Sequence, residues 1–282
     1  MTPRSPAAAR SWLLGAPLAL YLVVFLAYPS AYALKLALTD GASGRFPSLE
    51  PVRALLGDRL FWQALAGNLV VPALSVALEL VAGLALALLL AARMPARRLL
   101  RAAIVVPFAL PEIVFLTIVR ALLAPRGYAN GALASAGLPT VDFLLPGHGL
   151  AYASVIVVDA WRTTPVVFLI LLGALGALPR EVGEAARLDG AGALRRLWFV
   201  TLPLLAPAIL AALLLRGLDA LRIFAAPLVL AGVEGVPVLS TYAYHQWSDY
   251  GDDAGAAAAS AVLAVLCVAA SVPLLRRGAG AA

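Results

Sequence analysis

Charged side chains are scarce in this chain of 282 residues. They make up 13% of it, whereas hydrophobic residues make up 63%, and the mean hydropathy is +0.95. An ordinary soluble domain is about one quarter charged, so the composition excludes a disordered chain and argues strongly against a soluble enzyme. The net charge of +6 would suggest nucleic acid in a soluble protein. Here we expect no nucleic-acid partner, because basic residues left on cytoplasmic loops also orient membrane spans.

Cysteine, lysine and histidine, which often act in catalytic and metal sites, are nearly missing as well. Cys267 is the only cysteine, which excludes a disulfide framework and a cysteine-based metal cluster. A P-loop needs Gly-Lys-Ser/Thr, but the only lysine, Lys35, is followed by Leu36. The chain has no His-Glu-x-x-His and no Gly-x-Ser-x-Gly motif, and its histidines, His148 and His245, lie far apart. We therefore predict no catalytic residue, no metal site and no cofactor in this chain.

Long apolar runs are what the chain has instead. A helix needs about 20 apolar residues to cross the hydrocarbon core of a bilayer, and its backbone groups must be paired internally there. Six runs are long enough, which predicts an all-α integral membrane protein with six transmembrane helices. The predicted spans cover residues 13–38, 69–92, 102–123, 151–175, 203–230 and 254–275. The loops 39–67 and 124–150 are each long enough to hold a short helix on the membrane surface.

The basic residues divide unequally between the two sides of these spans. Twelve of the 21 fall in the two terminal tails and in the loops after the second and fourth spans, against five on the other side. This split predicts that both termini lie in the cytoplasm, with tails at 1–12 and 276–282 around a transmembrane domain at 13–275. The run Ala31-Tyr32-Ala33 imitates a signal-peptide cleavage site, but the apolar run continues to Leu38 and favours an uncleaved span.

The loop between the fourth and fifth spans has a helix-turn-helix pattern. Pro179 suits a helix start, and Glu181 and Glu184 place negative charge near the positive end of that helix. Gly190 suits the closing turn, where glycine adopts a positive φ at little cost. A second helix is expected over 191–199, before Pro203 opens the next span. An amphipathic connector at the membrane interface would show the same periodicity, so periodicity alone assigns no partner.

The residues of this loop resemble the EAA loop of ABC importer permeases. The resemblance is carried by Glu184-Ala185-Ala186, by Gly190 after three further residues, and by Val200 and Leu202-Pro203 after nine more. Asp189-Gly190-Ala191 is similar to the carbohydrate-importer branch of this family. The chain departs from that pattern at Val200, where the family has Ile, and at Leu197, where the branch often has Phe.

Other segments are similar to the same branch. They are Asp159–Pro165, Gly127–Asn130, Arg216–Phe224, and Tyr28-Pro29, the last resembling the branch of the larger maltose permease subunit. The segment Gly232–Pro237 departs from the Gly-Gly-Pro run that the family usually has there.

The resemblance implies a permease subunit of an ATP-driven sugar importer in a bacterial or archaeal inner membrane. The implied partners are a second permease subunit, two ATPase subunits that bind ATP and Mg²⁺, an extracytoplasmic solute-binding protein, and the sugar. The loop 177–202 would supply a coupling helix that docks on an ATPase through Glu184, Ala185, Ala186, Asp189, Gly190 and Ala191. The alternatives are a permease for another solute, such as glycerol phosphate, and a secondary transporter. The EAA loop and the lack of an internal repeat weaken the second alternative.

Ionisable residues within the predicted spans are costly in lipid and usually face the bundle interior or a watery path. They are Glu79, Glu112, Arg120, Asp159, Arg162, Arg216, Asp219 and Arg222. Asp159, Arg162 and Thr163 share one face of the fourth span, and Arg216 and Asp219 share one face of the fifth. Because the resembled permeases hold their substrate on the equivalent helices, we predict that these five residues line the substrate path.

Trp161 suits contact with a sugar face. The alternative is structural: the pairs Arg216–Asp219, Asp219–Arg222 and Asp159–Arg162 could only neutralise one another.

Overall fold

The computed structural model describes residues 15–91 and 96–279, and every regular element in this part of the chain is a helix. It contains five helices long and apolar enough to cross a membrane, and a bent pair of helices that would make a sixth. The all-α class is therefore confirmed. The chain divides into two compact units, which within these residues are 15–59 with 243–262, and 60–242 with 263–279.

The first unit begins with a helix over Gly15–Ala37, which includes the π-helical turn η1 (Val23–Ala27) and α2 (Tyr28–Ala37). It also holds α3 (Glu50–Gly57), the end of α13 (Leu239–Ser248) and the start of α14 (Asp253–Ala279). Between α2 and α3, a turn is built around Asp40, whose carboxylate accepts hydrogen bonds from the Ser43 hydroxyl and the Ala42 backbone N–H. These bonds hold the pKa of Asp40 below its ordinary value.

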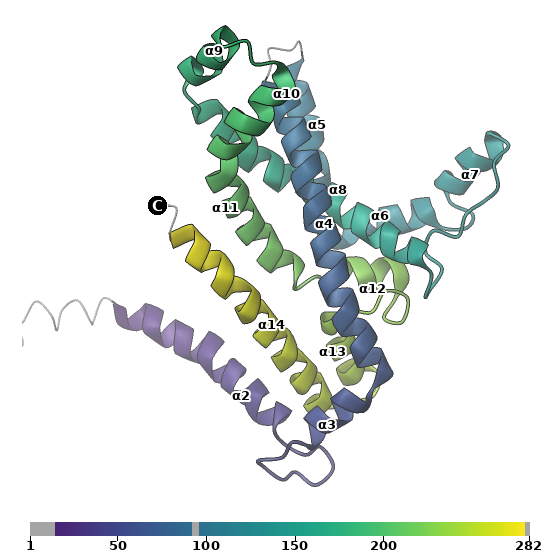
Figure 1. Cartoon of the computed structure of the whole chain (residues 1–282). Coiled ribbons are helices and arrows are strands. Elements are labelled where there is room, and N and C mark those ends of the chain that lie inside the picture. Colours follow the sequence, from purple (N-terminus) through teal and green to yellow (C-terminus); the bar gives the residue numbers. More distant parts are fainter. Residues whose placement is uncertain (1–14, 92–95, 280–282) are drawn as a thin grey trace, which may run out of the picture. The chain divides into compact units, whose positions relative to one another are not determined.

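Three long helices form the centre of the second unit: α4 (Arg59–Ala91), α8 (Gly149–Ala177) and α11 (Leu202–Ala220) (Figure 1). Leu90, Phe168 and Ala212 are among the buried residues that pack them together. A glycine lets α4 approach α8 closely, because a Cβ at Gly83 would lie 2.8 Å from a Val167 methyl carbon. The charged residues of these helices are therefore brought within reach of one another.

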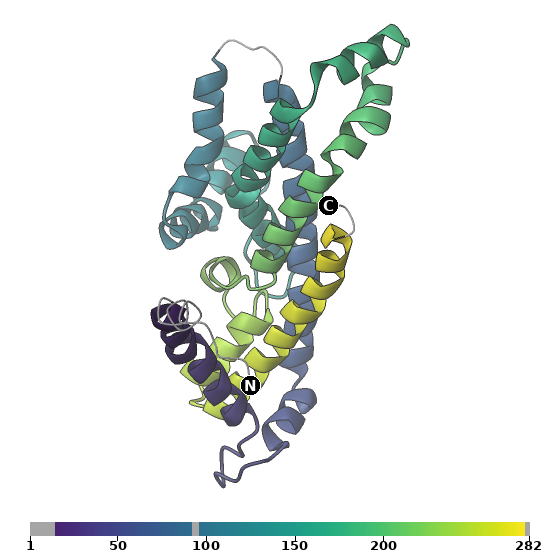
Figure 2. The same ribbon diagram turned by 90° about the vertical axis from the view of Figure 1, so that its left-hand side faces the viewer.

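The predicted third span, 102–123, is not one straight helix. It is divided into α5 (Arg97–Ala109) and α6 (Glu112–Leu123), and the chain bends by 96° between them. Pro111 causes the break, because it lacks an N–H and disfavours the helical conformation at the residue before it; Leu110 is extended, with ψ 144°. In Figure 2 the chain descends through α5 and then turns sharply into α6. The bend brings Glu112, in the first turn of α6, to within 3.0 Å of Arg162 on α8.

The predicted fifth span, 203–230, ends early. α11 stops at Ala220, and a separate short helix, α12, covers Ala225–Ala231. Two side chains satisfy the carbonyls released at this break: the Asn68 amide donates to the Leu221 carbonyl at 3.0 Å, and the Ser240 hydroxyl donates to that of Ile223. Polar partners from distant parts of the sequence thus compensate the end of the helix.

The start of this span also differs from the prediction. A second helix over 191–199 was expected to end before Pro203, but the helix runs without interruption from Ala193 to Ala220. It comprises α10 (Ala193–Arg196), the π-helical turn η2 (Leu197–Thr201) and α11. The Leu202 N–H reaches back to the Leu197 carbonyl, so the wider turn carries the backbone into the segment that begins at Pro203.

The predicted loops each contain a short helix, as expected. α3 lies in the first, and α7 (Tyr128–Ser135) lies in the second. The second loop is held by the buried Asn130, which accepts from the Val141 N–H at 2.7 Å and donates to the Val141 carbonyl at 2.9 Å. Membrane-surface positions for these two helices remain a prediction.

Candidate functional site

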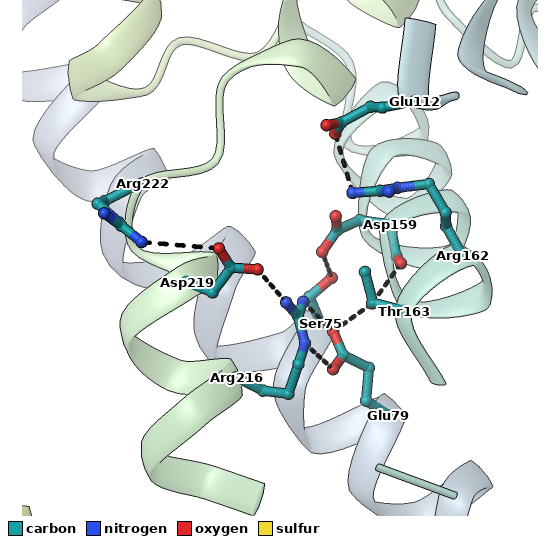
Figure 3. Close-up of polar contacts among 9 residues, drawn as sticks. All are labelled: Ser75, Glu79, Glu112, Asp159, Arg162, Thr163, Arg216, Asp219 and Arg222. Carbon is teal, nitrogen blue, oxygen red and sulfur yellow. Dashed lines mark hydrogen bonds and ion pairs between the residues drawn. The ribbon is translucent and has the colours of Figure 1, made fainter. Parts of the chain in front are cut away.

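A polar pocket of about 170 Å³ lies in the second unit, where α6, α8 and α11 meet (Figure 3). Three carboxylates and three guanidinium groups line it, together with four uncharged residues between Ala220 and Ala225. The charged residues are Glu112, Asp159, Arg162, Arg216, Asp219 and Arg222. Membrane helices keep such groups only where they pair or face a polar space, and both conditions are met here.

Behind this pocket lies a fully buried ion pair between α4 and α11. The side chain of Glu79 is 0% exposed, and Arg216 donates two hydrogen bonds to its carboxylate, at 2.7 and 3.0 Å. This bidentate geometry is the strongest form of the arginine–carboxylate contact. The third nitrogen of the guanidinium donates to the carboxylate of Asp219, which faces the pocket. Arg216 therefore bridges a buried carboxylate and an accessible one.

Hydroxyl groups complete the buried side of this arrangement. Thr163 on α8 donates to Glu79 at 2.8 Å, so α8 joins the contact between α4 and α11. Ser75, one turn before Glu79, lies 2.7 Å from a carboxylate oxygen of Asp159. Both buried carboxylates are thus held by hydrogen bonds, which is the condition under which a buried charge is tolerated.

The charges on the open side of the pocket are more exposed than the buried pair. Arg162 contacts Glu112 of α6 at 3.0 Å, and Arg222 approaches Asp219 at 3.8 Å. The side chain of Asp219 is 59% exposed and that of Glu112 is 41% exposed. These groups are the more accessible ones in the pocket, so they can exchange a protein partner for a ligand most readily.

The two charged faces predicted from sequence do converge on one pocket. Asp159, Arg162, Arg216 and Asp219 line it, whereas Thr163 points to Glu79 instead. Whether any of them contacts a substrate remains a prediction. Arg216–Asp219 and Asp219–Arg222 pair as the structural alternative anticipated.

Two expectations about α8 differ from the structure. The ion pair of Arg162 is made with Glu112, across to α6, and not with Asp159. Trp161 does not line the polar pocket: its ring packs edge-on against Phe115 and borders a separate apolar cavity of about 310 Å³. A residue beside Arg162 in sequence points about 100° away from it around a helix, which explains the separation.

The site residues predicted from the sequence do not include Glu79, Glu112, Arg222 or Ser75. The first three were visible as ionisable groups in apolar runs. Ser75 had a weaker signal, its spacing of one helical turn from Glu79. What the sequence could not supply was the contact of α4 with α11, since Glu79 and Arg216 are 137 positions apart.

The second candidate site is the loop 177–202. It forms α9 (Arg180–Leu188), which is closed at Gly190 with φ +75°. The Gly190 N–H bonds to the Arg187 carbonyl and the Ala191 N–H to that of Ala186, both at 3.0 Å, which is a Schellman motif. Glu184, Ala185, Asp189 and Gly190 are exposed, and Ala186 and Ala191 are half-buried. A short helix with an exposed face is therefore present at the predicted position, and its contact with an ATPase stays a prediction.

Comparison with known proteins identifies the family. Residues 79–277 match the family described as the inner membrane component of binding-protein-dependent transport systems. The chain belongs to this family. It is a permease of the ABC-transporter type, a multi-pass membrane subunit of a family that is not catalytic. The match includes both Glu79 and the loop 177–202.

Curated relatives of the permease include transport proteins with stated substrates. It is 37% identical over 228 residues to the trehalose transport system permease protein SugA of Mycobacterium tuberculosis, covering 79% of this chain and 73% of that one. It is 35% identical over 215 residues to the trehalose/maltose transport system permease protein MalF of Thermococcus litoralis, covering 73% and 72%.

A solved structure shares the fold. The permease superposes with a TM-score of 0.82 on a chain of a bacterial alginate ABC transporter, crystallised in complex with its alginate pentasaccharide-bound periplasmic protein. The superposition covers 94% of this chain and 93% of the other at 23% identity. At this identity the likeness shows the fold alone.

Proposed function

We propose that this permease imports a sugar, and that the polar pocket of the second unit belongs to the sugar path. The observation that carries the proposal is the convergence of two charged helix faces on one pocket in a chain whose curated relatives include trehalose and maltose permeases. Carboxylates accept hydrogen bonds from sugar hydroxyls and guanidinium groups donate to them, so Asp159, Arg162, Arg216 and Asp219 are suited to a polyhydroxylated ligand. Thr163 supports this group from behind.

The charge balance of the pocket supports an uncharged substrate. Three carboxylates and three guanidinium groups line it, and the buried Glu79 adds another negative charge behind it. An anion such as glycerol phosphate would meet no excess of positive charge, whereas phosphate is typically bound by arginine groups or backbone N–H groups. A neutral sugar needs no net charge, because it exchanges hydrogen bonds only.

For energy coupling, we propose that α9 docks on a separate ATPase subunit. ATP and Mg²⁺ then bind the ATPase and not this chain. The Schellman turn presents Glu184, Ala185 and Asp189 on an exposed surface, and the small side chains of this segment permit close approach of a partner. Closure of two ATPase subunits would pull two such helices together and switch two permease subunits between inward and outward access.

The same proposal sets the assembly and the orientation. The permease works as a heterodimer with a second permease subunit, two ATPase subunits and an extracytoplasmic solute-binding protein, in the inner membrane of a bacterium or archaeon. The basic loops lie in the cytoplasm, and so do the tails 1–12 and 276–282 on either side of the permease domain 13–275. Residues 1–14 and 280–282 lie outside the described residues.

The test is uptake of labelled trehalose and maltose by the complete complex in liposomes, with the solute-binding protein outside and ATP inside. We expect uptake to require both ATP and the binding protein. Labelled glycerol phosphate is the comparison solute, and its uptake in preference to the sugars would overturn the substrate assignment. Uptake driven by an ion gradient with no ATPase subunit present would overturn the proposed mechanism.

A further inference from the structure

We propose that Glu79 is a positioning residue of the sugar path: through Arg216 it fixes the direction of the Asp219 carboxylate without touching the sugar. The inference rests on the proposed function, because it takes the polar pocket as part of that path. Glu79 lies on α4, whereas every charged residue that lines the pocket comes from α6, α8, α11 or the turn after α11.

Glu79 has no route to a ligand of its own. Its side chain is fully buried and does not line the pocket. One carboxylate oxygen accepts from Arg216 Nε, and the other accepts from the second guanidinium edge nitrogen and from the Thr163 hydroxyl. Both oxygens are thus occupied by protein groups, so Glu79 acts only through what it holds.

What it holds is the orientation of a planar group. A guanidinium gripped along one edge by a bidentate carboxylate has its plane fixed, and the direction of its remaining N–H groups is fixed with it. In Arg216 the remaining nitrogen donates to Asp219 (Figure 3). Glu79 therefore determines where Asp219 is tethered, across two successive charged contacts.

Asp219, the group that Arg216 holds, lines two cavities. Arg216, Asp219 and Arg222 line the polar pocket and also a second cavity of about 430 Å³, bordered by Phe108, Val166 and Leu215 among others. These three charged side chains lie at the boundary between the two cavities. A sugar passing from one cavity to the other meets Asp219, which is 59% exposed and only loosely approached by Arg222.

Exchanging the two charges separates a role of this ion pair in the sugar path from a purely structural role. The double variant Glu79→Arg with Arg216→Glu retains an ion pair between α4 and α11, but it places a carboxylate at position 216 against Asp219. We expect Glu79→Ala alone to reduce the yield of assembled complex at least fivefold, and the exchange to restore that yield to within about twofold. Uptake per assembled complex should stay at least 10-fold below wild type, because like charges now repel at the pocket. Wild-type uptake by the exchanged variant would overturn the inference.

A second variant covers failure of the exchanged protein to assemble. Glu79→Gln keeps the shape of the side chain but replaces one acceptor oxygen with a donor, which opposes a donor of Arg216 and turns its plane. We expect uptake per assembled complex to fall at least fivefold. Thr164→Val is the matched control, because among residues 15–91 and 96–279 the Thr164 hydroxyl bonds only to the Ala160 carbonyl of its own helix; its uptake per complex should equal wild type. Equal uptake by Glu79→Gln and wild type would contradict the inference.

The two proposals fail in different ways. If the wild-type complex transports another solute and not sugar, the proposed substrate is wrong, and the same variants are then compared on that solute. If wild type transports sugar and both Glu79→Gln and the exchanged variant match it per assembled complex, only the positioning role is wrong.

Discussion

The polar pocket and the loop 177–202 use charge in opposite ways. In the pocket network, the acidic and basic groups come from four helices, and its inner members are buried and gripped by short contacts. In the loop, Glu181, Glu184 and Arg187 all belong to one short helix and are exposed. In the first region, side chains of opposite charge and hydroxyl groups of the same chain compensate each buried charge. In the second region, solvent solvates the charges.

The difference indicates what each region serves. Charges that are already paired and enclosed have their partners within the chain itself. An exposed helix with small residues and a tight turn has its binding surface available to another subunit. The following changes are expected to separate the two regions, starting with the largest effect.

Removal of Arg216 should be the most damaging change. Arg216→Ala leaves Glu79 charged, fully buried and without its bidentate partner, and loss of one member of a buried pair costs about 3–5 kcal/mol. The free energy of unfolding in mixed micelles measures this. Arg120→Ala is the control, since Arg120 is an exposed arginine on α6, and it should change the value by less than about 1 kcal/mol. Equal effects of the two substitutions would mean that the buried network contributes no special stability.

The hydroxyl of Thr163 should rank second. Thr163→Val removes the hydrogen bond to Glu79, and bonds to charged groups contribute about 1.5–3 kcal/mol. Thr164→Val removes only a bond within α8. The free energies of unfolding of the two variants should therefore differ by about 1–2 kcal/mol, with Thr163→Val the less stable. The reverse order would contradict the network as described.

The turn of the exposed loop should rank third in energy. Gly190→Ala forces a side chain into a backbone with φ +75°, which costs about 1–2 kcal/mol. Gly192→Ala is the matched control, because Gly192 has φ −63° and open space around its Cα. We expect ATP-driven uptake to fall at least fivefold for Gly190→Ala and less than twofold for Gly192→Ala. Equal uptake by both variants would count against a role for the turn in coupling.

The smallest stability effect should come from Arg222. Its contact with Asp219 spans 3.8 Å and both side chains are mostly exposed, and such pairs contribute about 0–1 kcal/mol. Arg222→Gln should therefore leave the midpoint of thermal unfolding nearly unchanged, while uptake per complex falls because the pocket loses a guanidinium group and its positive charge. A marked loss of stability would place Arg222 among the structural charges and not on the open side of the pocket.

Local signals in the sequence predicted much of this molecule. Hydropathy located the apolar segments, helical spacing put Asp159 with Arg162 and Arg216 with Asp219 on common faces, and Gly190 marked a turn. Pro111 was a local signal as well, but a count of apolar residues ignores it, so the bend before α6 and the contact of Glu112 with Arg162 were not predicted.

The rest depended on contacts between residues far apart in sequence. The end of α11 is stabilised by Asn68, 153 positions before the carbonyl that it contacts. Likewise, Glu79 became a partner of Arg216 only through the packing of α4 against α8 and α11. Spacing along one helix carries no information about which other helix will face it. The ion pair between Glu79 and Arg216 could therefore be found only from the structure.

The most direct test of the contrast between the two regions is the amount of ATPase subunit that copurifies with the permease. It is measured for Gly190→Ala, which disturbs the exposed loop, and for Glu112→Gln, which disturbs the pocket. We predict that the loop variant loses at least half of its ATPase subunit, whereas the pocket variant retains all of it and loses sugar uptake. Retention of the ATPase by Gly190→Ala together with its loss from Glu112→Gln would contradict the division of roles.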